Sequence, residues 1–306
     1  MAVGLALISA VLFGGMSVGL RLGLNRRPDA ALATLATVVG AFVVSLVFAA
    51  AESPSRGWHA GAAWPFLLAG ILQPGIGQIL VTMAIREVGA SRASVIFGVA
   101  PLVSVTIALV LLGEPLRWAL IVGAVLIVAG GVELARERMR PDHLRAIGLL
   151  YAFLVTILFS IRDNLVRSLS HSTDVPPGVA AAATLVSGVI VVSIVLVPRV
   201  HRWDGFAPFL GVGVLFGLSY VSLFEAYYRG RVTVVSPLVA TESLWGVLLT
   251  VLFLRHSEVV GRRLALGALG CAVGATAILM THGGDWLVPV VWIAIAWVVS
   301  QVARYR

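Results

Sequence analysis

Ten apolar segments of about 20 residues follow one another through this chain and set the strongest constraint on its fold. The chain is 59% hydrophobic and 12% charged, whereas soluble domains are roughly 45–50% apolar and about 25% charged. A membrane-spanning helix needs about 20 mostly apolar residues, because that length crosses the hydrocarbon core of a bilayer. An all-α integral membrane protein with ten transmembrane helices is therefore expected, its spans near residues 3–22, 30–51, 63–85, 92–112, 116–134, 146–166, 178–197, 207–228, 232–254 and 263–281.

Both ends of the chain contain an apolar segment. The first segment has no basic region before it and is longer than the apolar core of a signal peptide, so a permanent span is expected. A shorter apolar stretch at 286–302 is long enough for an eleventh helix across the membrane. Its Trp286, Trp292 and Trp297 suit a helix lying in the membrane interface equally well.

The chain also has the pattern of a duplication. Residues 1–135 and 146–282 each contain five of the segments; the charged linker 136–145 separates them, and the C-terminal apolar helix 283–306 lies outside the repeat. Because each repeat has an odd number of spans, the two halves are expected to insert with opposite orientation. Two inverted five-helix repeats are typical of secondary transporters, whose binding sites lie near the membrane midplane where the repeats meet.

Several residues keep their places in both halves. The stretch "FGGMSVGLR" at 13–21 aligns with "FSIRDNLVR" at 159–167, which keeps the Phe and the final Arg. Five further matches support the duplication: Gly70 with Gly211, Gly89 with Gly230, Glu114 with Glu258, Gly123 with Gly267, and Gly130 with Gly274.

The connections between segments, about 3–12 residues long, are too short to form a soluble domain, so the function is expected inside the membrane. All six histidines fall in loops or at helix ends, and the chain contains no HExxH or GxSxG motif. The single Cys271 has no His near it in the sequence. We therefore predict no catalytic residue, metal site or cofactor, and the sequence argues against a membrane enzyme.

All 22 basic residues are Arg, and the net charge is +8. Such a charge suggests nucleic acid in a soluble protein. Here the arginines lie mostly in loops and at helix ends, where they act as topology signals and contact lipid headgroups. The bilayer, not nucleic acid, is the expected partner. Connections after odd-numbered spans hold 14 Arg and those after even-numbered spans hold 6, which predicts an N-terminus outside the cell.

Some of these stretches resemble a known family. The run "REVGASRASVIFGVAPLVSVTIALVLLGEPLRWALIVGAVLIVAGG" at 86–131 resembles the EamA branch of the drug/metabolite transporter superfamily, with a Gly-Glu after the fourth span and a Gly-rich fifth span. "AVLFGGMSVGLRLG" at 10–23 resembles the family's first helix, and "YYRGRVTVVSPLVATESLWGVLLTVLFL" repeats the pattern in the second half.

The resemblance covers about residues 3–282 and implies a ten-helix carrier of the plasma membrane, with efflux as its direction. Its central cavity would be lined by helices 1, 3, 4, 6, 8 and 9. The chain departs from the family pattern at "RHSE" (255–258), which replaces the Gly-Glu, and in the tail 285–306. Its charge count also runs against the inside N-terminus of several members.

Glu242 is the sharpest functional candidate, because it lies near the centre of the span predicted at 232–254. Placing an acid there costs about 2.5–3.5 kcal/mol. Protonating a Glu of ordinary pKa at pH 7 costs about 3–4 kcal/mol, at about 1.36 kcal/mol per unit. Since the two are comparable, a small change in surroundings switches the charge, as a proton-coupled carrier requires. The alternative is a Glu bonded permanently to neighbouring hydroxyls or to an Arg.

Three further polar residues are candidates for the substrate or proton site: Gln73, Gln78 and Arg162. Gln73 and Gln78 flank Pro74 in "QPGIGQ", and a Pro/Gly-interrupted span indicates a carrier site. The glutamines lie about 140° apart around a regular helix, so both face the cavity only if the helix is distorted. Arg162 either turns inward toward Glu242 or an anionic substrate, or extends to the headgroups.

Aromatic residues complete the candidate site. Tyr220 lies at the place in the eighth span that matches the interrupted part of the third. Trp245 shares a helix face with Glu242, where it either stacks on a flat or cationic ligand or packs.

Two pairs of charged residues are expected to stabilise the structure and not to bind a ligand. Asp163 and Arg167 stand four positions apart in the favourable order, as do Glu225 and Arg229, so we predict two ion pairs near the membrane interface.

The sequence thus predicts a secondary transporter of a small polar or amphipathic metabolite, acting as a monomer or a homodimer. A non-transporting scaffold and a channel remain as alternatives. A channel favours rings of like residues from several subunits, whereas two duplicated halves suit one gated cavity within one chain.

A reporter fused after Arg306 tests the topology. With an outside N-terminus, an eleventh span returns the tail to the cytoplasm and places Arg304 and Arg306 where the charge rule expects them. We therefore expect a fluorescent protein that folds only in the cytoplasm to be bright at this position. A dark fusion, matched by an active external reporter, would mean that 286–302 does not cross.

Overall fold

The computed structural model describes residues 1–88, 96–97, 99–136, 146–200, 203–253 and 262–281, and seven residues between 287 and 296. Within these ranges every regular element is helical. The linker from 137 to 145, Gly89 and Glu258 lie outside them, as does most of the segment predicted at 286–302. The eleventh helix therefore stays a prediction.

The first half of the chain forms eight described helical elements. The third predicted span is not one regular helix, because it is kinked at Gln73 within η2. The elements are α1 (Ala2–Arg26), α2 (Ala30–Arg56), the short turn η1 (Ala60–Ala62), α3 (Trp64–Gly70), the kinked segment η2 (Ile71–Ile76), α4 (Gly77–Val88), α6 (Ala100–Leu111) and α7 (Trp118–Arg136).

The second half follows the same plan. Its ninth predicted span is also divided, here by two residues that are not helical. The helices are α8 (Ala146–Ser172), α9 (Pro177–Leu196), α10 (Phe206–Arg229), α11 (Val232–Val239), α12 (Glu242–Phe253) and α13 (Arg262–Thr281).

Each of the ten predicted segments contains at least one of these helices. Six described helical stretches are long and apolar enough to cross a membrane: Ala2–Leu24, Ala30–Arg56, Trp64–Val81, Ala146–Ser172, Pro177–Arg199 and Phe206–Arg229. Three more are apolar but shorter: Ala100–Leu111, Trp118–Gly130 and Leu269–Thr281. The structure thus shows an all-helical membrane protein, and the count of ten crossings stays a prediction.

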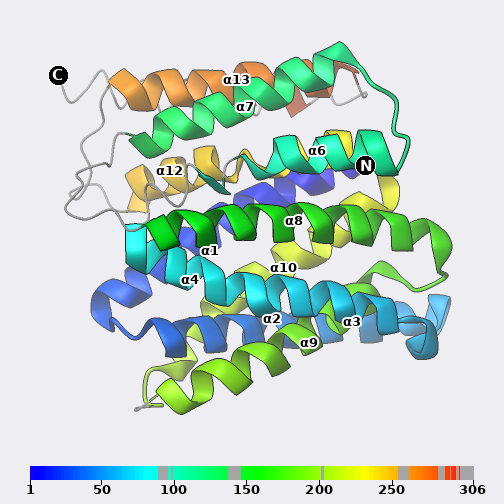
Figure 1. Ribbon diagram of the computed structural model, residues 1–306, viewed down its shortest axis with the longest axis vertical. Helices are drawn as coiled ribbons and strands as arrows, with labels where there is room; N and C mark the ends of the chain where they lie inside the picture. The colour runs from blue at the N-terminus through cyan, green and yellow to red at the C-terminus, as the bar shows by residue number, and fades with distance from the viewer. Residues whose placement is uncertain are drawn as a thin grey trace.

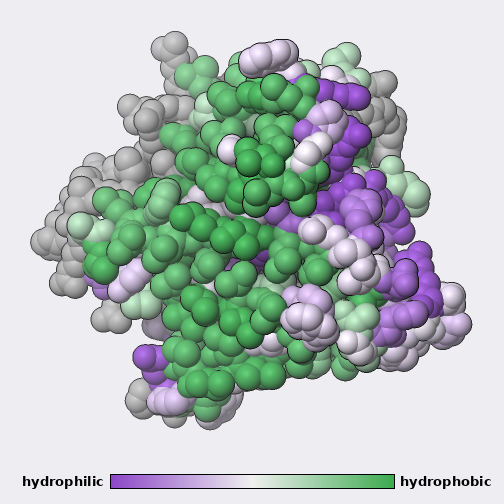
Figure 2. All heavy atoms as spheres, turned by 45° about the vertical axis from the view of Figure 1, so that its right-hand side comes forward, coloured by the Kyte–Doolittle hydropathy of each residue, from purple (hydrophilic) through white to green (hydrophobic). Residues whose placement is uncertain are grey.

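The long helices lie side by side, with their connections at the two ends of the bundle (Figure 1). We call the end that contains Met1 the N-terminal end. The end of α2, the end of α10 and the start of α11 also lie there, since Arg56 contacts Glu225 and a Cβ at Gly230 would touch Ala2. Figure 2 brings this end forward and shows hydrophilic side chains gathered on it beside a largely hydrophobic surface.

The packing of the helices is reciprocal between the halves. In the first half α1 packs on α10 and α12; in the second, α8 packs on α4 and α6. Likewise α2 packs on α10, α9 packs on α3 and η2, and α7 pairs with α13. This is the scheme that two equivalent halves produce when each contacts the other. Their opposite orientation in the membrane stays a prediction.

A glycine lets the third span approach α9 closely. A Cβ at Gly70 would collide with the backbone carbonyl of Thr184 and the hydroxyl of Ser187. That hydroxyl also donates a 2.8 Å hydrogen bond to the carbonyl of Leu67. Small residues at such contacts let helix backbones pack in a membrane, where lipid offers no hydrophobic driving force between helices.

Gly70→Ala and Gly211→Ala form a matched pair of variants, since the two glycines occupy the same place in the repeat. At Gly70 the new methyl meets α9 backbone, whereas at Gly211 it meets no atom within 4 Å. We expect Gly70→Ala to lower the free energy of unfolding by about 1–3 kcal/mol, and Gly211→Ala to leave it unchanged or higher. Unfolding of both proteins in detergent would measure this; equal stabilities would contradict it.

Candidate functional site

Glu242 lies at a break in the ninth span. Pro237 cannot donate a backbone hydrogen bond within α11. Two residues later the helix ends, and the hydroxyl of Thr241 donates a 2.6 Å bond to the carbonyl of Leu238. Glu242 then begins α12, so its carboxylate lies at a helix N-terminus, which favours negative charge.

Glu242 keeps accessible surface among buried residues. Its neighbours Thr241, Leu244 and Trp245 are buried, whereas Glu242 is exposed. On its backbone side, α1 comes close, because a Cβ at Gly14 would lie 3.1 Å from the carbonyl oxygen of Glu242. The backbone of Glu242 is therefore fixed by packing, while the residue keeps accessible surface although it lies deep among the helices.

A buried ion pair lies across from this acid. In α8 the Nε of Arg162 is 2.9 Å from Oδ1 of Asp163, and both residues are 7% exposed. Tyr227 of α10 and Ser236 of α11 interact with the Asp163 carboxylate through side-chain hydrogen bonds. Arg162 also acts electrostatically on Glu242. The inward orientation considered for Arg162 is therefore the one the structure shows.

Asp163 does not have the partner that the four-residue spacing predicted. It pairs with Arg162, because its side chain turns toward α10 and α11. Arg167 lies one turn nearer the N-terminal end, where it donates a 2.8 Å bond to the carbonyl of Tyr227. Exposed helix-end carbonyls attract a guanidinium as a carboxylate does.

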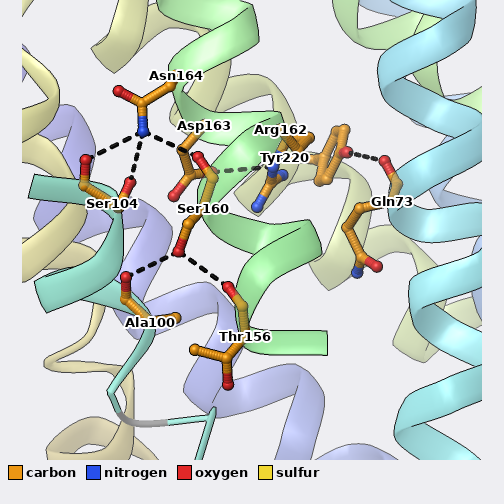
Figure 3. A network of polar contacts seen from close by, with 9 residues as sticks. All are labelled: Gln73, Ala100, Ser104, Thr156, Ser160, Arg162, Asp163, Asn164 and Tyr220. Atoms are coloured by element: carbon orange, nitrogen blue, oxygen red, sulfur yellow. Dashed lines mark hydrogen bonds and ion pairs between the residues drawn. The ribbon is translucent and has the colours of Figure 1, made fainter. Parts of the chain in front are cut away.

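Tyr220 connects the ion pair to the interrupted third span (Figure 3). The guanidinium carbon of Arg162 lies 5.4 Å from the centre of the Tyr220 ring, within the range of a cation–π contact. The hydroxyl of Tyr220 donates a 3.1 Å bond to the backbone carbonyl of Gln73. Three predicted site residues thus lie in one network with Asp163.

The shape of the third span explains why this carbonyl is available. Gln73 is buried and has a φ of −151° and a ψ of 119°. A residue before proline avoids the helical region, and Pro74 itself has no N–H. The N–H of Gly77 bonds to the carbonyls of Leu72 and Pro74. Gln73 therefore accepts from a side chain of α10 instead.

The remaining site candidates are less closely linked to this network. Gln78 lies in the first turn of α4 and is partly exposed. Trp245 is buried at 7% exposure and packs with Ala10, Val11 and Leu248. The packing alternative for Trp245 thus has direct support, and the roles of both residues in binding stay predictions.

A polar ladder that sequence reasoning missed joins α8 to the fourth span (Figure 3). Three α8 side chains, spaced four residues apart on one helix face, each donate to a backbone carbonyl. The bonds run from Thr156 to Ile96 (3.1 Å), from Ser160 to Ala100 (3.0 Å) and from Asn164 to Ser104 (3.0 Å). The spacing was visible in the sequence, but the carbonyl partners were not.

The second predicted ion pair lies at the N-terminal end. Glu225 and Arg229 are in contact, and Arg56 lies 3.9 Å from Glu225 and 3.3 Å from Glu52. Glu52 also accepts a 2.9 Å bond from the N–H of Gly178, at the start of α9. This network ties α2, α9 and α10 together. Among the described residues no group of three or more His, Cys, Asp or Glu side chains is arranged to hold a metal.

Comparison with known proteins agrees with this architecture. The model of the EamA-like transporter family matches residues 1–133 and 146–280, so the chain belongs to that family. This confirms the resemblance to the EamA branch of the drug/metabolite transporter superfamily, and the two matches fall on the two predicted repeats. The members of this family are membrane transporters. No curated protein matches the sequence.

The fold is also found among solved structures. One, described only as "Crystal structure of protein", superposes with a TM-score of 0.75 at 19% sequence identity. The match covers 92% of this chain and 96% of the other. At this identity the comparison shows a shared fold.

The Arg162–Asp163 pair is suited to a double-mutant cycle. Removing one partner leaves a buried charge without compensation, which typically costs about 3–5 kcal/mol. We expect Arg162→Met and Asp163→Asn each to lower the midpoint of unfolding in detergent, and the double variant to lose much less than the sum. Additive losses would show that the two side chains do not stabilise one another.

Proposed function

We propose that this protein is a secondary transporter that moves a small polar or amphipathic metabolite by alternating access, with export as its direction. Glu242 is the group that binds a proton or a cationic part of the substrate. The observation that carries the proposal is the exposed Glu242 carboxylate at a helix break, opposite the buried pair of Arg162 and Asp163. Family membership supports transport as the activity.

The position of Glu242 supports a binding role. In secondary transporters, sites are built where membrane helices are discontinuous, because helix ends offer polar backbone groups away from water. Here the helices are interrupted at Gln73 in the third span and at Ala240–Thr241 in the ninth span. These two spans do not correspond to one another in the repeat. The network through Tyr220 and Arg162 lies between them.

The charges favour a positive ligand. Arg162 is paired with Asp163, so these two groups nearly cancel. Glu242 makes no ion pair with any basic residue whose side chain the structure describes. Its negative charge is therefore available for a proton, an amine or another cationic group. An anionic substrate would have to displace Asp163 from Arg162.

The transporter would act in the plasma membrane as a monomer or a homodimer, with its substrate and the surrounding lipid as partners. Since the site lies within one chain, one subunit is sufficient for binding.

Thermal unfolding of the purified protein tests the role of Glu242. The panel comprises amino acids, nucleosides, sugars and organic cations, each at pH 6 and pH 8. A ligand that binds only the folded state at about 100 times its Kd stabilises it by about 2.7 kcal/mol. We expect one class to raise the melting temperature in a pH-dependent way, and Glu242→Gln to abolish that dependence.

Asp174→Asn is the matched control, because it also removes one acidic charge but lies exposed in the connection between α8 and α9. It should behave as the native protein does. A ligand that stabilises native protein and Glu242→Gln equally at both pH values would mean that Glu242 is neither a coupling nor a binding group.

A further inference from the structure

Glu114 holds the start of α11 at the N-terminal end. It follows Gly113, whose φ of +61° turns the chain after α6. Its Oε1 accepts a 2.9 Å bond from the N–H of Val232; its Oε2 accepts from the N–H of Thr233 at 3.0 Å and from the Thr233 hydroxyl at 2.7 Å. A carboxylate that accepts helix N-terminal N–H groups is strongly bound, because charge and helix dipole both favour it.

Arg167 holds the adjacent end of α10. It donates to the carbonyl of Tyr227 at 2.8 Å and to that of Tyr228 at 3.4 Å, and it interacts electrostatically with Glu114. A positive group thus contacts the C-terminus of one helix and a negative group the N-terminus of the next. Together they fasten the turn at Gly230 and Arg231 to α8 and to the loop after α6.

The fastened turn lies over the closed side of the candidate site. Every residue of α11 from Val232 to Leu238 is buried, and so are Tyr220, Phe224 and Tyr227 on α10. These residues fill the bundle between the exposed Glu242 and the N-terminal end. A ligand can therefore pass between Glu242 and that end only if α11 moves from its present position.

We propose that Glu114 and Arg167 form a latch that closes the site at the N-terminal end and releases when the site opens there. The proposal rests on the carrier function proposed above. Three features suit a latch more than a fixed support. The bonds are polar and only partly buried, so water can replace them on release. Glu114 stands in a loop, and α11 is a short helix ended by a break at Ala240–Thr241.

Cysteine labelling tests the latch without a known substrate. Leu238 is fully buried one turn before Glu242, so Leu238→Cys in a Cys271→Ala background reports access to the closed side. The probe is a membrane-impermeant maleimide, applied from the side that carries a tag fused before Met1. We expect Glu114→Ala and Arg167→Gln to speed labelling from this side about tenfold, equivalent to about 1.4 kcal/mol.

Thr233→Val is a milder variant on the other side of the contact. It removes one of the three bonds to Glu114 and keeps the shape of the side chain, so folding should be preserved and labelling should rise by a smaller factor. Arg117→Gln is the control, because Arg117 is an exposed residue of the same loop. It should label at the native rate.

Each outcome decides the matter. If all three latch variants unfold at native temperatures and label at the native rate, Glu114 and Arg167 are fixed structural contacts and the latch is wrong. An equal rise in Arg117→Gln, or a rise from both sides of the membrane, would indicate general loosening and also overturn it. Since alternating access requires one side to close as the other opens, labelling from the opposite side should fall.

The ligand panel separates this result from the carrier proposal. If the latch variants label faster but no ligand of the panel stabilises the protein, the latch proposal is supported and the binding role proposed for Glu242 is not. A Glu242-dependent ligand together with unchanged labelling would support the carrier and reject the latch.

Discussion

The buried pair of Arg162 and Asp163 is the contact on which the centre of this bundle depends. A single charge within a membrane-spanning helix is costly, and the cost falls when the charge is paired and its remaining lone pairs are bonded. Here Tyr227 and Ser236 interact with the Asp163 carboxylate, and the guanidinium of Arg162 lies over the ring of Tyr220. Because these partners come from α10 and α11, the pair fixes α8 against both. Glu242, the acid for which we propose a binding role, is not part of this pair.

The two halves solve the same packing problem differently. Ser160 of α8 corresponds in the repeat to Gly14 of α1; Ser160 faces α6 and Gly14 faces α12. Ser160 bonds to the carbonyl of Ala100, within a ladder of three such bonds. Gly14 instead brings α1 against the backbone of α12, where a Cβ would lie 2.7 Å from the nitrogen of Gly246. The same position of the repeat therefore makes a side-chain hydrogen bond in one half and a close backbone contact in the other.

Most of the helical segments could be predicted from hydropathy and local spacing, because a helix that crosses lipid must be apolar whatever its neighbours are. They also predicted the interruption at Gln73, since proline acts through local geometry. The prediction from spacing was wrong at Asp163: the four-residue rule predicted Arg167 as its ion-pair partner, whereas the structure shows Arg162. The choice depends on Tyr227 and on other side chains from helices distant in sequence, which no local rule contains. For the same reason the carbonyl partners of Asn164 and its neighbours could not be predicted.

The helix α11 lies between Glu114 and the break that precedes Glu242. Its first N–H groups are held by Glu114, and its last residues lead through Thr241 to Glu242. Eight residues of helix span about 12 Å, and the break at Ala240–Thr241 separates them from α12, which Glu242 begins. We expect a displacement at the start of α11 to shift this break and so to change the surroundings of Glu242. The Gly-Glu after the fourth span thereby has a physical role besides its resemblance to the family: Glu114 fixes the start of the helix that leads, through the break at Ala240–Thr241, to Glu242.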